Sequence, residues 1–299
     1  MKRLHHSKNL VLPLAILIGA VFYQWMGYLT FLSPYLIFVM LFITYCRVSF
    51  KEIRLTKFQG ILLSVQLLLS VAVYLALAWW NPIVAEGVFI CIFVPTATAA
   101  PVVTSMLGGS ISKVAAYSLF CNLSIAVLGP VLLAAIGDKA DYTFNESFLL
   151  ILRQVAPLLL GPLLCAQVLG WFFPKAKEYI RGQQQLSFYL WAFALVIIVG
   201  SCVSFAIKTW RPENTLPMIW LALGALAACL LQFVIGRWIG RRYADDPVAG
   251  GQGLMQKNTV LAVWMAMAYM NPIASIAPAA YIAWQNIINS IQIARHKEN

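Results

Sequence analysis

Charged side chains are scarce in this 299-residue chain, where they make up 10% of the residues while hydrophobic residues make up 62%. An ordinary soluble domain has about 25% charged and about 45–50% apolar residues. The 21 basic and 10 acidic residues are too few to coat a water-soluble protein of this size. The shortage of charge therefore excludes a soluble enzyme, a disordered chain and a coiled coil, and it indicates a surface that faces lipid.

Patterns of metal-ligating and catalytic residues are also missing. The three histidines, His5, His6 and His296, lie near the ends of the chain, and no carboxylate cluster accompanies them. The six cysteines have no CxxC spacing and fall in six different apolar blocks, so we expect small buried side chains rather than disulfides. They are Cys46, Cys91, Cys121, Cys165, Cys202 and Cys229. The sequence therefore predicts no metal site, no cofactor and no acid–base enzyme.

Long apolar runs, in contrast, fill most of the chain. A bilayer core of about 30 Å requires about 20 apolar residues of helix. Ten blocks of this kind predict an all-α polytopic membrane protein with ten transmembrane helices. The blocks lie near residues 9–25, 29–46, 58–79, 83–107, 112–136, 148–172, 186–207, 215–236, 252–270 and 273–294.

Basic residues are distributed unequally between the segments that connect these blocks. With the N-terminus inside, the inner segments contain 16 Lys or Arg residues and the outer segments contain three. Because an excess of Lys and Arg marks cytoplasmic segments, we expect a multi-pass protein of the plasma (inner) membrane with both termini in the cytoplasm. The net charge of +11 then needs no nucleic-acid partner to explain it.

Two blocks contain residues that interrupt a helix. The fourth contains Pro95 and Pro101, and proline removes a backbone donor. The ninth contains the glycine-rich run 249–253, followed by polar residues. These blocks are equivalent if the chain consists of two inverted five-helix repeats, about 9–136 and 148–294. Paired interruptions in inverted repeats point to the binding site of a transporter. Prolines and glycines are also common in membrane helices without such a role.

Several motifs resemble those of the bile acid:sodium symporter (BASS) family, and the resemblance extends over the whole ten-span layout. The matching residues are Arg153 to Gly161, Asn258, Leu261-Ala262, Asn271-Pro272, Pro278-Ala279-Ala280 and Trp284-Gln285-Asn286, with Pro95, Thr98-Ala99, Val102, Thr104 and Gly109 in the fourth block. The resemblance implies a panel of spans 1, 2, 6 and 7 and a core of spans 3–5 and 8–10. It also implies that discontinuous helices 4 and 9 cross in the core.

In that family, organic anions move between panel and core by alternating access, and sodium ions bind around the crossing. The resemblance thus implies that this chain transports an organic anion, which could be bile-acid-like, steroid-like or a small carboxylate. The residues that it assigns to substrate binding, or to the neighbourhood of that site, are Thr96, Thr98, Asn258, Thr259 and Asn286. An alternative role for these residues is to satisfy backbone groups that the helix breaks leave free.

The cation sites of the family are altered in this chain. Gly253 stands where the family has a glutamate, Lys257 where it has a sodium-binding glutamine, and Ala100-Pro101 where it has a serine–asparagine pair. Gln256 lies beside the altered position, and Ser118 and Asn122 lie in the fifth span, where the family places further cation ligands. The alternative role for Ser118 and Asn122 is to form hydrogen bonds between helices. Since sodium needs a cage of oxygen ligands, we do not expect sodium coupling in the usual form.

Lys257 is the single charge deep within an apolar block. Insertion of a charge at this depth costs free energy, so a functional role is the first hypothesis for this residue. Three roles compete: a tethered cation in place of sodium, a carrier of protons, or a contact for the anionic substrate. Snorkelling to the interface is the structural alternative. A channel-like or non-transporting receptor and a proton-coupled exchanger that uses Lys257 are the alternatives to a carrier.

Overall fold

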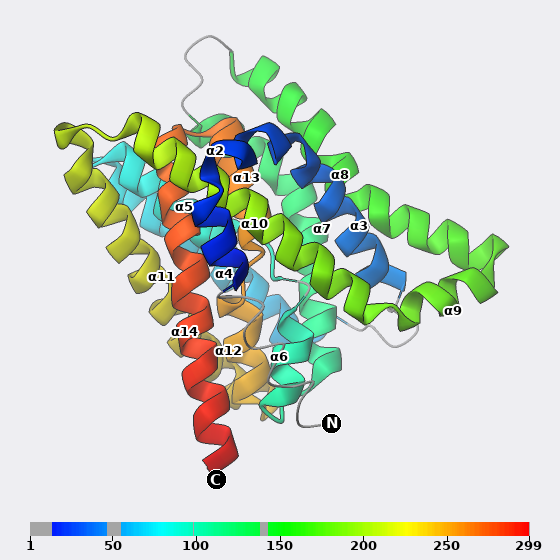
Figure 1. The fold of residues 1–299 in the computed structure, drawn as a ribbon. Helices are drawn as coiled ribbons and strands as arrows, with labels where there is room; N and C mark the ends of the chain where they lie inside the picture. The colour runs from blue at the N-terminus through cyan, green and yellow to red at the C-terminus, as the bar shows by residue number, and fades with distance from the viewer. Residues whose placement is uncertain (1–13, 47–54, 98, 138–142, 299) are drawn as a thin grey trace. The chain divides into compact units, whose positions relative to one another are not determined.

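The computed structural model describes residues 14–46, 55–97, 99–137 and 143–298 (Figure 1). Within these residues the chain is almost entirely helical and contains no β-strand. Six helical segments there are long and apolar enough to cross a membrane. They are Tyr23–Cys46, Lys57–Ala78, Ile111–Ile136, Phe144–Phe172, Tyr189–Lys208 and Pro212–Ala244. The prediction of an all-α multi-pass membrane protein is therefore confirmed, while the count of ten spans and the inverted repeats stay predictions.

The chain divides into two compact units, each built from separate stretches of sequence. Unit 1 comprises Met1–Arg47 and Gly161–Asn214, and unit 2 comprises Val48–Leu160 and Thr215–Asn299. Whether they correspond to the panel and core implied by the BASS resemblance stays a prediction.

Unit 1 combines helices from the N-terminal stretch of the chain with helices from residues 161–214. Its elements are a helix over residues 14–21, α2 (Tyr23–Met26), η1 (Gly27–Leu32), α3 (Ser33–Cys46), the second half of α8 (Phe144–Phe172), α9 (Pro174–Gly182) and α10 (Gln184–Thr209). The first helix approaches α10 closely, because a Cβ atom at Gly19 would lie 2.6 Å from the carbonyl oxygen of Val196. Glycine at this position therefore allows the two backbones to pack.

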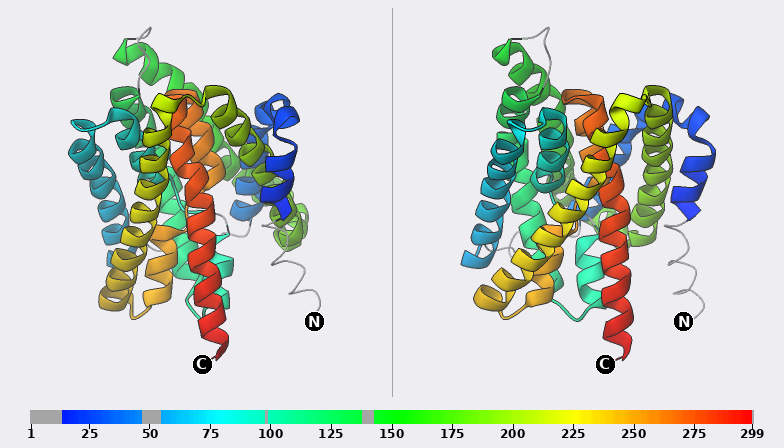
Figure 2. Two further views of the ribbon diagram at one scale, coloured as in Figure 1. Left: turned by 60° about the vertical axis from the view of Figure 1, so that its left-hand side comes forward. Right: turned by 90° about the vertical axis from the view of Figure 1, so that its left-hand side faces the viewer.

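Unit 2 contains the two interrupted blocks. Its elements are α4 (Lys57–Ala78), α5 (Pro82–Phe93), α6 (Ala100–Met106), α7 (Ile111–Ile136), the first half of α8, most of α11 (Pro212–Ala244), α12 (Pro247–Met255), α13 (Thr259–Tyr269), η2 (Pro272–Ser275) and α14 (Ile276–Glu298). Its apolar core includes Val88 and Ile92 of α5, Leu221 of α11 and Tyr281 of α14. Figure 2 shows α11 and α14 side by side in both views.

The two interrupted blocks begin in the same way. The Asn81 side chain accepts a hydrogen bond from the backbone N–H of Val84 at the start of α5, and Pro82 follows it. At the start of α12, the Asp246 side chain accepts from the N–H of Ala249, and Pro247 follows it. Capping by Asn or Asp with proline in the first turn defines a helix start sharply, since proline needs no partner for an N–H there.

Both interruptions are present, and the second lies at the polar residues that follow the glycine run. Helix α5 ends at Phe93 and α6 begins at Ala100, while residues 256–258 separate α12 from α13. The glycines of the ninth block lie inside α12 instead. A Cβ atom at Gly250 would lie 2.0 Å from the carbonyl oxygen of Gly236 in α11, so these glycines serve close helix packing. Of the two features that predicted this interruption, the polar residues mark its position and the glycines do not.

The expectation that all six cysteines are buried is wrong for one of them. Five are buried and Cys165 of α8 is exposed, and all six are free thiols. Exposure of this thiol carries little penalty because a thiol behaves as a small apolar group and α8 is apolar enough to face lipid.

Candidate functional site

The two helix breaks of unit 2 lie against one another. Thr96 in the first break and Lys257 in the second form an isolated antiparallel β-bridge. This bridge joins residues from opposite parts of the sequence at the point where both helices are interrupted. Figure 1 shows α6 and α12, which flank the two breaks, close together in unit 2.

Two backbone hydrogen bonds accompany the bridge. The N–H of Ala97 donates to the carbonyl oxygen of Gln256 at 2.7 Å, and the N–H of Asn258 donates to the carbonyl oxygen of Pro95 at 2.9 Å. In an uninterrupted helix these groups would bond within their own helix. Each break therefore supplies hydrogen-bond partners for backbone groups that the other has left free. Such partners are needed because unpaired backbone N–H and C=O groups are costly when they are buried.

Lys257 lies at the centre of this arrangement with only 1% of its surface exposed. Its Nζ atom donates a hydrogen bond to the carbonyl oxygen of Val94 at 3.2 Å. Val94 is the C-terminal cap of α5, so the ammonium lies at the negative end of that helix dipole. Among the described residues, no carboxylate lies within ion-pair distance of Lys257. The ammonium is therefore stabilised by backbone dipole and hydrogen bonding rather than by an opposite charge.

Thr96 is equally buried, and its hydroxyl donates to the carbonyl oxygen of Gly253 in α12 at 2.7 Å. A Cβ atom at Gly253 would lie 3.2 Å from Cδ1 of Tyr117, so a larger side chain there would require a shift of the tyrosine ring. The position to which the BASS resemblance gives a glutamate is therefore closely packed, with Tyr117 and Leu62 as the nearest side chains.

The side chain of Gln66 in α4 forms hydrogen bonds with the backbone at the first break. Its Nε2 atom donates to the carbonyl oxygens of Phe93 and Val94 at 2.8 and 3.0 Å. Its Oε1 atom accepts a hydrogen bond from the hydroxyl of Tyr117. Sequence reasoning missed this residue. The signal in the sequence that could have identified it was an amide in the middle of an otherwise apolar block.

A second connection, also missed from the sequence, comes from α11 and α14. The hydroxyl of Tyr281 donates to the carbonyl oxygen of Met255 at 2.9 Å, which is the last residue of α12. Gln232 in turn donates to the hydroxyl of Tyr281 at 3.0 Å and to the carbonyl oxygen of Cys91 at 3.4 Å. The C-terminal ends of α5 and α12 are thus both bonded by side chains from neighbouring helices.

Amide side chains of α14 form hydrogen bonds with α12 and with the second break. Oε1 of Gln285 accepts from the backbone N–H of Lys257 at 3.1 Å. Nδ2 of Asn289 donates to Oε1 of the predicted ion-site residue Gln256 at 2.6 Å, and Nε2 of Gln252 donates to Oδ1 of Asn289 at 3.0 Å. Gln256 is therefore part of a row of buried amides between α12 and α14.

The predicted pair in the fifth span lies beside the first break. The hydroxyl of Ser118 in α7 donates to the carbonyl oxygen of Thr96 at 3.4 Å. Asn122, also in α7, donates from Nδ2 to the carbonyl oxygen of Ser118 at 2.7 Å. Its Oδ1 atom is buried and has no hydrogen-bond partner among the described residues. Asn122 therefore retains an acceptor next to the break, and a cation role for the pair stays a prediction.

The remaining predicted substrate residues differ in their positions. Oδ1 of Asn258 accepts from the N–H of Leu261 at 3.2 Å and so caps α13, of which Thr259 is the first residue. Asn286 is half-buried on α14 and donates to the carbonyl oxygen of Ile282, one turn earlier, at 2.6 Å. Thr98 lies outside the described residues. Thr96, Asn258 and Thr259 are thus together at the breaks, and their contact with a substrate stays a prediction.

No family model and no curated protein matches the chain. Within the part of the chain that the structure describes, no group of three or more His, Cys, Asp or Glu side chains could hold a metal ion. The chemistry present at the breaks consists of one ammonium group, amides, hydroxyls and the capped ends of the interrupted helices.

Proposed function

We propose that this protein is a secondary carrier that moves an organic anion across the plasma membrane by alternating access. Its fold would be that of the BASS family, with ten helices in two inverted repeats and both termini in the cytoplasm. The observation that carries the proposal is the bonded pair of helix breaks with Lys257 between them. Irregular backbone at membrane depth is tolerated where it is buried or lines a cavity, and paired breaks are typical of transporter binding sites.

The charge at the breaks supports an anionic substrate. Lys257 supplies a buried positive charge, and the N-terminal end of α13 begins two residues later at Thr259. A helix N-terminus attracts anions through its dipole, which remains at α13 although the N–H groups of Thr259 and Leu261 bond to Lys257 and Asn258. A carboxylate, as in a bile-acid-like, steroid-like or small-carboxylate substrate, has the chemistry to bind here, with Thr96, Thr98, Asn258, Thr259 and Asn286 as the residues to test.

A carrier of this kind also needs two bodies that move as units. The division of the chain into two compact units supports this requirement. We propose that unit 1 is the panel and that unit 2, which contains both breaks, is the core.

Lys257 also bears on the ion that is coupled to transport. An ammonium at the C-terminal end of α5 supplies the positive charge that a bound sodium ion would otherwise bring. Together with Gly253 in place of a glutamate, this supports transport without sodium. A tethered cation is therefore our proposed role for Lys257.

A second candidate is proton-coupled exchange through the same lysine. The partner of its Nζ atom is the neutral carbonyl group of Val94. Such an ammonium can release a proton without leaving a buried carboxylate unpaired, and lysine serves as a proton carrier where it is buried. This candidate differs from the first in requiring that a proton gradient drives transport.

A two-step experiment tests the proposal. Purified protein is first screened for thermal stabilisation by organic anions in sodium, potassium and choline salts. The anion that stabilises it is then used, labelled, for uptake into proteoliposomes with imposed sodium or proton gradients. The carrier proposal expects saturable counterflow that needs no sodium. Uptake driven by a proton gradient would favour the exchanger, a strict sodium requirement would overturn the tethered cation, and binding without any counterflow would favour a receptor.

A further inference from the structure

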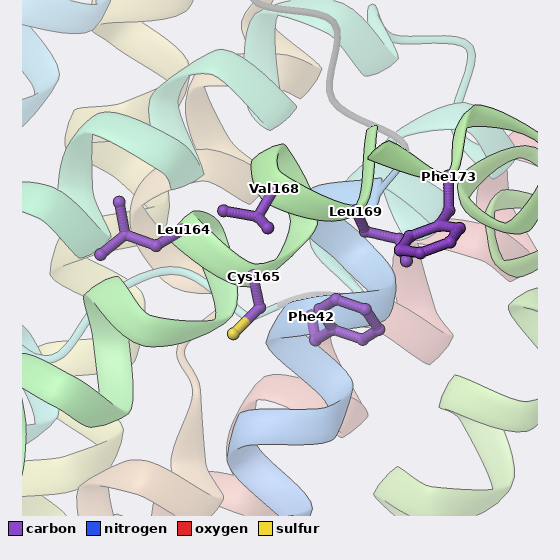
Figure 3. Close-up of a pocket in the computed structure, with 6 residues that line it drawn as sticks. All are labelled: Phe42, Leu164, Cys165, Val168, Leu169 and Phe173. Atoms are coloured by element: carbon purple, nitrogen blue, oxygen red, sulfur yellow. The ribbon is translucent and has the colours of Figure 1, made fainter. Parts of the chain in front are cut away.

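Unit 1 carries an open apolar hollow of about 400 Å³ between α3 and the second half of α8 (Figure 3). Phe42 of α3 lies on one side, and Leu164, Cys165, Val168, Leu169 and Phe173 line the rest. Figure 3 shows the Cys165 side chain extending from α8 on the side where Phe42 lies. Among the described residues that line the hollow, this thiol is the one polar group, so the chemistry of the hollow fits a hydrocarbon chain.

A short basic helix, α9, begins directly after this hollow. Phe173 lines the hollow and is also the N-cap of α9. The helix carries Lys175, Lys177 and Arg181. Arg181 pairs with Glu178 at 3.3 Å, whereas no carboxylate among the described residues lies within ion-pair distance of the two lysines. Lys175 and Lys177 come two and four residues after Phe173, so two positive charges follow the hollow in the chain.

The backbone of α8 makes room for one of these lysines. A Cβ atom at Gly170 would lie 2.8 Å from Cδ and 3.0 Å from Nζ of Lys177. The stem of Lys177 thus lies over Gly170, next to the hollow-lining Leu169. This packing holds the ammonium close to the end of the hollow, because a long lysine stem covers apolar surface while its charge stays at the rim.

We propose that unit 1 binds an anionic phospholipid, with one acyl chain in the hollow and the phosphate at Lys175 and Lys177. An inorganic anion would leave the hollow uncovered, and a neutral lipid would leave both lysines without a counter-charge. The aromatic residues Trp171 and Phe172, which are 77% and 71% exposed, precede α9 as expected for residues at headgroup depth. In the proposed orientation α9 lies on the cytoplasmic side and faces the anionic leaflet, where this lipid is available.

Lipid binding by the full chain is measurable in two ways. The protein is reconstituted in nanodiscs of phosphatidylcholine alone or with phosphatidylglycerol, and lipids that it retains are identified by native mass spectrometry. The second readout is the alkylation rate of Cys165, the exposed thiol among six free cysteines. We expect retained phosphatidylglycerol and slower alkylation in the discs that contain it.

The double variant Lys175→Gln/Lys177→Gln should lose this preference, with about a fivefold loss of phosphatidylglycerol affinity for each lysine. Its alkylation rate should then be the same in both kinds of disc. The matched control is Arg241→Gln/Arg242→Gln on α11, which removes the same charge from exposed positions of unit 2. Equal loss of phosphatidylglycerol in the control would overturn the proposal.

Val168→Trp tests the hollow with the charges intact. The indole ring should fill the space of an acyl chain and reduce retention of phosphatidylglycerol as strongly as the lysine variant does. If Val168→Trp retains the lipid as the unsubstituted protein does, no chain occupies the hollow and the proposal is wrong. Neither readout depends on transport, so this outcome leaves the carrier proposal untouched.

Discussion

Thr96 and Lys257 pair in an antiparallel β-bridge, and each donates a side-chain hydrogen bond to the helix that the other follows. The Thr96 hydroxyl reaches Gly253 of α12, and the Lys257 ammonium reaches Val94, the cap of α5. The two breaks are therefore mutually dependent, because each supplies both backbone and side-chain partners to the other.

Lys257→Gln should make transport sensitive to sodium. The substitution removes the positive charge from the C-terminal end of α5 and adds an amide oxygen, which is a ligand that sodium accepts. We expect uptake into proteoliposomes to increase with an inward sodium gradient in the variant and to remain unchanged by it in the unsubstituted protein.

Lys257→Arg is the control for this substitution, since it keeps the charge and should stay independent of sodium. If Lys257→Gln transports at the original rate with and without sodium, the ammonium does not act as a tethered cation.

Gln66→Leu should destabilise unit 2. It leaves the carbonyl oxygen of Phe93 without the Nε2 donor and takes the acceptor from the hydroxyl of Tyr117. An unsatisfied buried polar group costs about 1–3 kcal/mol. We expect a lower free energy of unfolding, measured by urea denaturation in detergent and followed by tryptophan fluorescence.

The matched control for Gln66 is Gln292→Leu on α14. Gln292 is half-buried, and its Nε2 atom donates to the carbonyl oxygen of Ile288 in its own helix at 3.4 Å. Its replacement should change stability by a few tenths of a kcal/mol at most, as is usual for substitutions outside a buried network. Equal effects of the two substitutions would show that the Gln66 bonds contribute nothing.

Hydropathy and breaker residues predicted the membrane helices and the interruption of two blocks. Pro95 and the polar residues after α12 were sufficient for this, because prolines and buried polar groups disturb a helix locally. Gln66 and Gln232 were not recognised, since a single amide in an apolar block does not reveal which backbone group it will reach. That partner depends on the packing of a distant helix, which periodicity cannot supply.

Gly250→Ala should be strongly destabilising because the new Cβ atom would lie 2.0 Å from the carbonyl oxygen of Gly236 and 2.7 Å from Cα of Gly240. These are backbone atoms, so α11 and α12 would have to separate. Overpacking of this kind costs about 1–3 kcal/mol. Thermal unfolding in detergent should show a lower Tm than that of the unsubstituted protein.

Gly60→Ala is the opposite case in α4, where a Cβ atom would meet no other atom within 4 Å. Since alanine favours helix by about 1 kcal/mol over glycine, this variant should raise the Tm or leave it unchanged. A drop in Tm equal to that of Gly250→Ala would contradict the packing explanation for both glycines.

Glu86→Leu should loosen the connection between α13 and η2. The Glu86 carboxyl group is buried in α5, and its Oε2 atom accepts from the backbone N–H of Asn271 at 2.8 Å. Without an acceptor, this N–H costs about 1–3 kcal/mol. Hydrogen exchange measured by mass spectrometry should be faster around residues 270–275 in the variant.

Glu86→Gln separates the acceptor from the charge. The amide oxygen of glutamine can still accept from Asn271, so exchange should remain closer to that of the unsubstituted protein. If Glu86→Gln exchanges as fast as Glu86→Leu, the charge of the carboxylate and not its acceptor oxygen secures the connection.

The dependence of the two breaks on one another has a consequence for biosynthesis. Val94 and Lys257 are 163 positions apart in the sequence. At a ribosomal rate of about 5–20 residues per second, the second break is synthesised about 10–30 s after the first. During that interval α5 and α6, with 12 and seven residues, are each too short to cross a bilayer alone. We therefore expect this region to remain sheltered, for example in the translocon or beside an insertion chaperone, until residues 256–258 have been made.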